Sequence, residues 1–115
     1  MPHFILEQGN ALTTPEARTD AMRIAGEVGG ACDFIEASDI KLRICDTADF
    51  LMLDGRQSYL HLTAKLLSGR TPEQKEQLAI GLRAALAERF PEIDSISIDV
   101  VDMDPFPYKK HLRAL

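Results

Sequence analysis

The stretch TPEQKEQL at residues 71–78 decides the fold of this 115-residue chain, because it marks a helix start and recurs in shorter form as TPE at residues 14–16. In both places threonine suits the N-cap of a helix and proline suits its first turn. At the second place Gln74 stands three residues after Thr71, a spacing that predicts a capping box. The repeated signal indicates two helices in two similar halves of the chain.

Apolar residues follow each start signal at helical spacing. They are Ala17, Ala21, Met22, Ala25 and Val28 in the first half and Leu78, Leu82, Ala85, Leu86 and Phe90 in the second. We expect the first helix to stop at Gly29-Gly30, because glycine commonly terminates helices. Each helix therefore has one face suited to packing against a sheet.

Each predicted helix lies between two predicted strands. The strand-like segments are residues 3–7 and 40–45 around the first helix, and residues 59–66 and 96–101 around the second. Alternation of apolar and other residues in them predicts strands with one buried face. Two right-handed β-α-β units side by side predict an α/β (α+β) fold, a four-stranded sheet with both helices on one face. We expect a single domain over residues 1–115, with pseudo-repeats at roughly 2–46 and 59–102.

The other face of the predicted sheet needs a cover. Residues 59–66 place Tyr59, His61, Thr63 and Lys65 on it, a set too mixed for a core and unusual for open water. A closed symmetric oligomer is the natural way to cover such a face. Tyr59 and its neighbours therefore predict contact between subunits.

Residues 46–55 are apolar in the middle and end in the turn signal Asp54-Gly55. We predict a short edge strand here. Two interpretations of its segment Phe50-Leu51-Met52 stay open, contact with a neighbouring subunit or packing into the core of its own chain.

Composition excludes several classes of function. The formal net charge of −5 argues against nucleic-acid binding, which normally needs a basic surface. No apolar run approaches the ~20 residues of a membrane span, and the N-terminus lacks a signal pattern, so we expect a cytoplasmic protein with no membrane partner. Cys32 and Cys45 lack metal-site spacing and are expected to be buried or partly buried free thiols. The three histidines are scattered, so no metal site is predicted.

Proline at position 2 has two interpretations. A strand tolerates proline at its first position, where no N–H is needed. If Met1 is removed, however, Pro2 becomes the chain terminus and its nitrogen becomes a secondary amine. A terminal amine has a pKa of roughly 8, and cations or burial lower it toward the range in which a general base works at neutral pH. Pro2 is therefore a candidate catalytic base.

Three cations are candidates for binding an anionic substrate near that amine. Lys41 and Arg43 stand two apart on a predicted strand and project to the same face. Arg70 directly precedes the N-terminus of the second helix, which also favours anions. The alternative interpretation is that each is a solvated surface cation. His3 and His61 are expected to have structural roles.

Several segments together resemble the 5-carboxymethyl-2-hydroxymuconate isomerase family of the tautomerase superfamily. They are MPHFI at 1–5, IKLR at 40–43, YLHLTAK at 59–65 and LLSGRTPEQKE at 66–76. The resemblance spans nearly the whole chain. It implies a tautomerase-like homotrimer that needs no cofactor and uses the amino-terminal proline as its proton-transfer base.

The resemblance also implies roles for the cations and a reaction. The family's Gly-Arg arginine matches Arg70, and its basic residues after the first helix match Arg43 and Lys41. We favour Arg70 and Arg43 over Lys41, because lysine lacks the planar fork of arginine. The implied activity is an isomerase that transposes C=C bonds, 5-carboxymethyl-2-hydroxymuconate delta-isomerase, acting on an unsaturated hydroxy polycarboxylate in aromatic compound degradation, the breakdown of homoprotocatechuate.

Two alternatives remain at this stage. One is a related keto-enol tautomerase acting on a smaller acid, which a panel of substrates with different numbers of carboxylates would distinguish. The other is a non-catalytic trimeric interaction protein, which needs no free amine and is favoured if Met1 is retained. The tail at residues 104–111 is predicted to pack over a sheet edge or a neighbour, although Phe106 and Tyr108 could equally line a pocket.

Overall fold

The computed structural model describes residues 1–115 and contains four strands, two α-helices and one short 3₁₀ helix. In chain order they are β1 (His3–Gly9), α1 (Pro15–Gly30), η1 (Ala37–Asp39), β2 (Lys41–Asp46), β3 (Tyr59–Leu67), α2 (Pro72–Arg89) and β4 (Ser95–Met103). This order is the predicted pair of β-α-β units.

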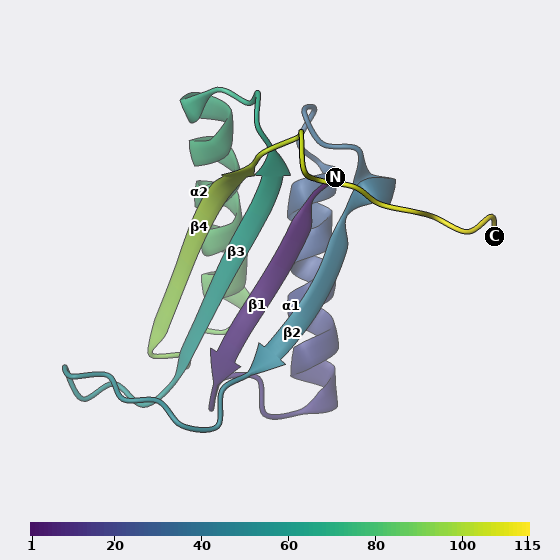
Figure 1. Ribbon diagram of the computed structural model, residues 1–115. Coiled ribbons are helices and arrows are strands. Elements are labelled where there is room, and N and C mark those ends of the chain that lie inside the picture. Colours follow the sequence, from purple (N-terminus) through teal and green to yellow (C-terminus); the bar gives the residue numbers. More distant parts are fainter.

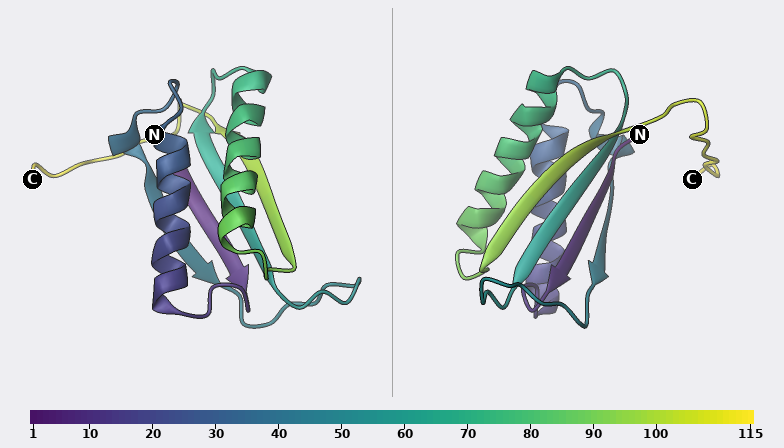
Figure 2. Two further views of the ribbon diagram at one scale, coloured as in Figure 1. Left: turned by 180° about the vertical axis from the view of Figure 1, so that it is seen from behind. Right: turned by 60° about the vertical axis from the view of Figure 1, so that its left-hand side comes forward.

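The four strands form one sheet in the order β2-β1-β3-β4. Strands β1 and β2 run parallel, as do β3 and β4, whereas β1 and β3 are antiparallel. Both helices cover the same face, and the other face is open (Figures 1 and 2). The predicted fold class is confirmed.

Both helices begin where the repeated signal places them. The Thr14 hydroxyl accepts a hydrogen bond from the Ala17 N–H at 3.1 Å. The Thr71 hydroxyl accepts from the Gln74 N–H at 3.1 Å, and the Gln74 side chain accepts from the Thr71 N–H at 2.9 Å. The capping box is confirmed, and it satisfies backbone donors that a helix start leaves free.

Helix α1 ends at Gly30, as predicted, but not through the predicted glycine termination. The helix includes Gly29 and Gly30, and its C-cap is Ala31 in the right-handed conformation. Gly29 instead allows close packing, since a Cβ there would lie 2.7 Å from the buried ring of Phe4. Gly29 therefore brings α1 against β1, and the helix does not end through a left-handed residue.

The core lies between the sheet and the two helices. Residues of β3 alternate strictly, with Leu60, Leu62, Ala64 and Leu66 buried under the helices and the intervening side chains half-buried on the open face. Each large apolar side chain buried in this way contributes about 1.5–3 kcal/mol to the free energy of folding. The stripe that was predicted for α2 supplies the opposite wall.

The predicted edge strand at residues 46–55 is wrong. Strand β2 ends at Asp46, and residues 47–58 contain no strand. The Asp46 carboxylate accepts hydrogen bonds from Arg18 and Gln8, both at 2.8 Å, which ties the end of β2 to α1 and β1. Phe50 then turns back onto Gly9 and stands edge-on to Tyr59, with ring centroids 5.1 Å apart. These contacts divert the chain from the sheet edge.

Packing against its own chain describes part of this segment, and contact with a neighbouring subunit stays a prediction for the rest. Phe50 and Met52 are half-buried against their own chain, whereas Leu51 is 82% and Leu53 95% exposed. Gly55 has φ 90° and its N–H donates to Met52 O at 3.0 Å, so the Asp-Gly turn is as predicted.

The chain after Met103 has no helix or strand and passes beside the N-terminus before extending past β2 (Figures 1 and 2). Cys32 is buried, but Cys45 is exposed, contrary to expectation, because it projects from the open face of an edge strand. Neither helix is long and apolar enough to cross a membrane.

Candidate functional site

The candidate site lies where β1 begins. Pro2 is buried, and its carbonyl accepts a hydrogen bond from the Lys41 N–H at 3.0 Å, which joins it to the start of β2. Because β1 and β3 are antiparallel, with His3 opposite Lys65, the start of β1 also lies beside the end of β3. The fold thus brings residues 2, 41 and 65–70 together. We call this region the proline end of the sheet.

Arg70 is held firmly beside β3. Gly69 has φ 126°, a left-handed conformation that glycine adopts without a steric cost and that turns the chain from β3 toward α2. The Arg70 guanidinium donates to Leu67 O at 3.1 Å and to Phe34 O at 3.0 Å. Arginine has five N–H donors, so part of the group stays available to a carboxylate.

Lys41 contacts the first residue of the chain. Its ammonium donates to the Met1 sulfur at 2.8 Å, and Met1 is only 8% exposed. A thioether is a weak acceptor compared with a carboxylate. Removal of Met1 would therefore free the ammonium of this partner and open the space beside Pro2.

Burial lowers the pKa of the chain-terminal amine. The Asp39 carboxylate opposes this by raising the pKa, and the positive charges of Arg70, Lys110 and Lys41 lower it further. Desolvation and nearby cations both favour the neutral form of an amine. The proline end thus favours a terminal amine in its basic, proton-accepting state.

Arg43 occupies a different position from Lys41 and Arg70. It projects from β2 to the open face, as predicted, and its Nη1 donates to Nδ1 of His3 at 3.2 Å. Of the three predicted cations, Lys41 and Arg70 lower the pKa of the terminal amine. Arg43 instead contacts His3, the residue that follows Pro2.

His3 joins β1 to the tail. Because arginine can only donate, Nδ1 of His3 accepts from Arg43, which leaves the proton on Nε2 to donate to the Tyr108 hydroxyl at 2.9 Å. Burial, followed by the charges of Arg43 and Lys41, lowers the pKa of His3. The imidazole is therefore neutral near pH 7 and has a structural role in this network.

None of the cations at the proline end is neutralised by an ion pair. The six salt bridges of the molecule involve Arg18, Arg23, Arg56, Lys75 and Arg89. Lys41, Arg43, Arg70 and Lys110 take part in none of them. Unpaired cations beside a buried amine form a region suited to an anionic ligand.

The sequence did not predict two charged residues of the site, Asp39 and Lys110. For Tyr108 it left two interpretations open. Asp39 stands two residues before Lys41, and this short spacing could have indicated that Asp39 lies near the same site. Lys110 and Tyr108 belong to a tail whose sequence has no periodicity that could place it beside β1.

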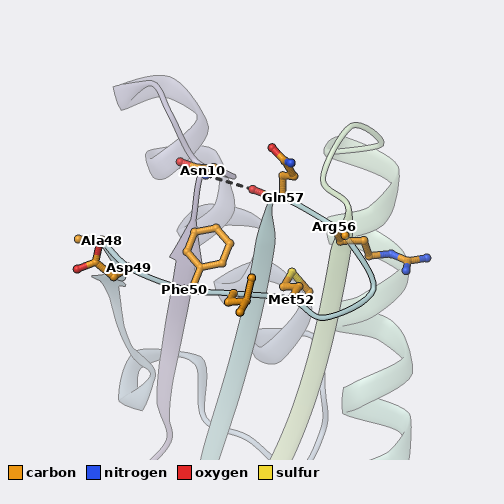
Figure 3. A pocket seen from close by; sticks show the side chains of 9 residues that line it. Asn10, Ala48, Asp49, Phe50, Met52, Arg56 and Gln57 are labelled. Carbon is orange, nitrogen blue, oxygen red and sulfur yellow. Dashed lines mark hydrogen bonds between the residues drawn. The ribbon is translucent and has the colours of Figure 1, made fainter.

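A separate pocket of about 360 Å³ lies at the other end of β1 (Figure 3). The segment at residues 47–57 forms most of its wall, with Phe50 on one side and Arg56 on another, and Asn10 donates to Gln57 O across its rim at 3.1 Å. We call this region the loop end of the sheet. It contains none of the predicted site residues.

Comparison with solved structures establishes the fold. The chain is similar to a 5-carboxymethyl-2-hydroxymuconate isomerase from Deinococcus radiodurans R1, with 19% identity, a TM-score of 0.80 and coverage of 97% of this chain and 90% of that one. It is also similar to a member of the cis-3-chloroacrylic acid dehalogenase family, with 17% identity, a TM-score of 0.75 and coverage of 98% and 82%.

A third similar structure is a fused 4-OT that forms a symmetric trimer, with 16% identity, a TM-score of 0.76 and coverage of 89% and 85%. The resemblance to tautomerase-superfamily proteins that the sequence predicted is thus confirmed in the fold. No protein-family model and no curated protein sequence matches the chain.

Proposed function

We propose that this protein is a cofactor-independent isomerase of the tautomerase type, in which the amine of Pro2 is the general base. The substrate class is an unsaturated hydroxy polycarboxylate, of which 5-carboxymethyl-2-hydroxymuconate is the leading candidate. The observation that carries the proposal is a buried chain terminus surrounded by cations that have no acidic partner, Lys41 and Arg70.

Removal of Met1 is the first requirement of the proposal. In the unprocessed chain the nitrogen of Pro2 is an amide and has no basicity. After removal, the new amine lies one residue from the old one, within about 3.8 Å along the chain, and meets the same cations. Burial and these cations then favour its neutral form, as they do for the amine of Met1, whereas Asp39 opposes them.

The reaction follows from this arrangement. Pro2 takes a proton from a dienol hydroxyl, or from a carbon next to a carbonyl, and returns it at another carbon of the conjugated system, so that the double bonds move. Arg70 and Lys41 bind the carboxylates and stabilise the negative charge that spreads onto oxygen in the intermediate. Because that charge is greatest in the intermediate, these cations bind it more tightly than the substrate.

A homotrimer is part of the proposal. The open face of the sheet carries half-buried side chains such as Tyr59, His61 and Thr63, and a symmetric trimer is the state of a similar fused 4-OT. Closed symmetry would cover this face in all three subunits. Analytical ultracentrifugation tests this directly, and a monomer at micromolar concentration would contradict it.

The test of the proposed base begins with the intact mass of the purified protein, which reports whether Met1 is present. The processed protein should isomerise 5-carboxymethyl-2-hydroxymuconate, and Pro2→Ala should lower kcat/KM by about 10²–10⁴. A primary amine remains in that variant, so a chain with Met1 retained before Pro2 is the stricter control and should be inactive. Full activity in either form would overturn the proposal.

Carboxylate number separates the leading substrate from a smaller acid. We expect kcat/KM to fall as carboxylates are removed from the substrate, because each loses a contact with an unpaired cation. Equal activity on a monocarboxylate enol would instead favour a keto-enol tautomerase of a smaller acid.

A further inference from the structure

The tail that follows β4 lies against the proline end of the sheet. In each view of the molecule it passes beside the N-terminus, although the two segments are at opposite ends of the sequence (Figures 1 and 2). Its closest defined contact is the hydrogen bond of 2.9 Å between the Tyr108 hydroxyl and Nε2 of His3. The two rings also meet edge to face, with centroids 5.9 Å apart.

This contact is well determined by the groups around it. Arg43 fixes which nitrogen of His3 carries the proton, so the imidazole presents a donor to Tyr108. His3 in turn is the second residue after Met1 on a strand paired on both sides. Tyr108 is accordingly anchored to a strand with a neighbour on each side, even though the tail itself has no helix or strand.

Lys110 follows two residues after this anchor. It forms no ion pair, and its charge acts on the chain-terminal amine together with those of Arg70 and Lys41. The neighbouring Lys109 is not among the main charges that act on this amine. Of the two adjacent lysines, Lys110 is therefore the candidate for a cation of the proline end.

We propose that residues 104–110 form a strap over the proline end, held by the hydrogen bond between Tyr108 and His3, and that Lys110 is a substrate-binding cation of the site. This inference rests on the proposed function for the identity of the ligand, a polycarboxylate. Its geometric part, the contact of the tail with β1 through Tyr108 and His3, stands independently of any activity.

The strap gives the site a wall from the far end of the chain. Lys41 and Arg70 come from β2 and from the turn after β3, and Lys110 adds a charge from the tail. Tyr108 acts through Lys110 as a positioning residue. A ligand with several carboxylates can therefore be bound by cations from three separate segments.

The test compares Lys110→Ala with Lys109→Ala as the matched control. The first readout is the pKa of the Pro2 amine in the processed protein, followed by NMR of a proline labelled with ¹⁵N. Three other groups face this amine, namely Asp39, Arg70 and Lys41. They are unchanged in both variants. We expect Lys110→Ala to raise the amine pKa and Lys109→Ala to leave it unchanged. Equal values in the two variants would overturn the strap.

The second readout is ligand binding, with aconitate as an unsaturated tricarboxylate probe. Lys110→Ala should weaken its binding about tenfold, Tyr108→Phe should weaken it less, and Lys109→Ala should bind as the wild type. If Pro2→Ala is fully active but Lys110→Ala still raises the pKa of the Pro2 amine, the proposed function fails and the strap stands. If Pro2 proves essential but Lys110→Ala changes neither readout, the strap fails and the proposed function stands.

Discussion

Both ends of the sheet carry charged side chains, but they use them differently. At the loop end three acids have partners, since Asp46 pairs with Arg18, Asp54 pairs with Arg56, and Asp94 accepts from a backbone N–H. At the proline end Lys41 and Arg70 have only a thioether and backbone carbonyls. Charges that neutralise one another hold the fold, whereas cations left unpaired at a buried terminus are available to a ligand.

The internal duplication makes this contrast informative. Both β-α-β units have a threonine N-cap and a proline in the first helical turn, and both pack their helix on the same face. The difference between the ends therefore comes from a few residues and not from the architecture. Substitutions matched between the ends can test which differences matter.

The largest expected difference concerns an aromatic ring packed on glycine at each end. Phe4 is fully buried against Gly29, whereas Phe50 is half-buried against Gly9. We expect Phe4→Ala to lower the free energy of unfolding by about 3–5 kcal/mol. Phe50→Ala should cost about 1–2 kcal/mol, because a half-buried ring loses less apolar contact.

Urea denaturation of both variants measures these costs. Phe4→Leu, which keeps most of the apolar volume, provides a milder substitution if Phe4→Ala does not fold. Equal costs at the two positions would mean that Phe50 is covered in solution, as it would be in a subunit interface, and would favour the interpretation of residues 50–52 as a contact surface.

The second prediction compares two arginines. Arg70→Ala should lower kcat/KM about 10²-fold or more, because it removes a positioned donor from the developing negative charge. Arg56→Ala at the loop end should leave kcat/KM unchanged. Arg70 also binds Leu67 O and Phe34 O, so a thermal melt of each variant must accompany the kinetics.

Arg70→Lys sharpens this comparison. It keeps the charge but loses the planar fork, so an intermediate loss of activity is expected. An Arg70→Ala protein that melts as the wild type and keeps full activity would remove Arg70 from the site.

The sequence predicts the scaffold well because its signals are local. The Thr-Pro-Glu repeat and the alternation in residues 59–66 report on contacts within a few residues or on one buried face, and the structure confirms both. The edge strand at residues 46–55 failed because Phe50 packs on Gly9, a contact between distant segments that no local pattern records.

The site is harder to predict for the same reason. Pro2 and the Gly69-Arg70 junction have recognisable local sequences. Asp39 and Lys110 reach the terminal amine only because a 3₁₀ helix and an irregular tail follow particular paths. Arg43 stays a predicted substrate-binding cation, and its contact with His3 depends on the register of β2 against β1, which the sequence does not specify.

The third prediction concerns pH at the proline end. The folded protein lowers the pKa of His3, through burial first and Arg43 next, so it disfavours protonation that the unfolded chain accepts near pH 6.5. Stability is therefore fully present above about pH 6.5 and decreases as the pH falls through the lowered pKa of His3.

Denaturation curves between pH 7.5 and 5 test this expectation. His3→Gln should lose the His3 component of the pH dependence, whereas the control His61→Gln should keep it because His3 is intact. A wild-type curve that is flat over this range, or one that His3→Gln does not change, would contradict the role of His3 in holding the proline end.

The smallest expected effect is at the loop end. There the loss of stability comes from protonation of Asp46 and occurs at acidic pH. The hydrogen bond from Arg18, followed by that from Gln8, lowers the pKa of Asp46. The unfolded chain binds the proton more readily, so this contribution is present above about pH 3.9 and is lost as the pH falls through the lowered pKa. Asp46→Asn should slightly destabilise the protein at pH 7, and the difference from wild type should vanish in strong acid.

The exposed Asp49, which forms no ion pair, provides the matched control, since Asp49→Asn should match the wild type at pH 7. Because Asp46 is exposed, water and salt screen its pairing with Arg18, which is why this effect ranks below that of His3. A larger loss of stability from Asp46→Asn than from His3→Gln would reverse the order. The paired acids of the loop end would then be more important for the fold than the hydrogen-bond network beneath the tail.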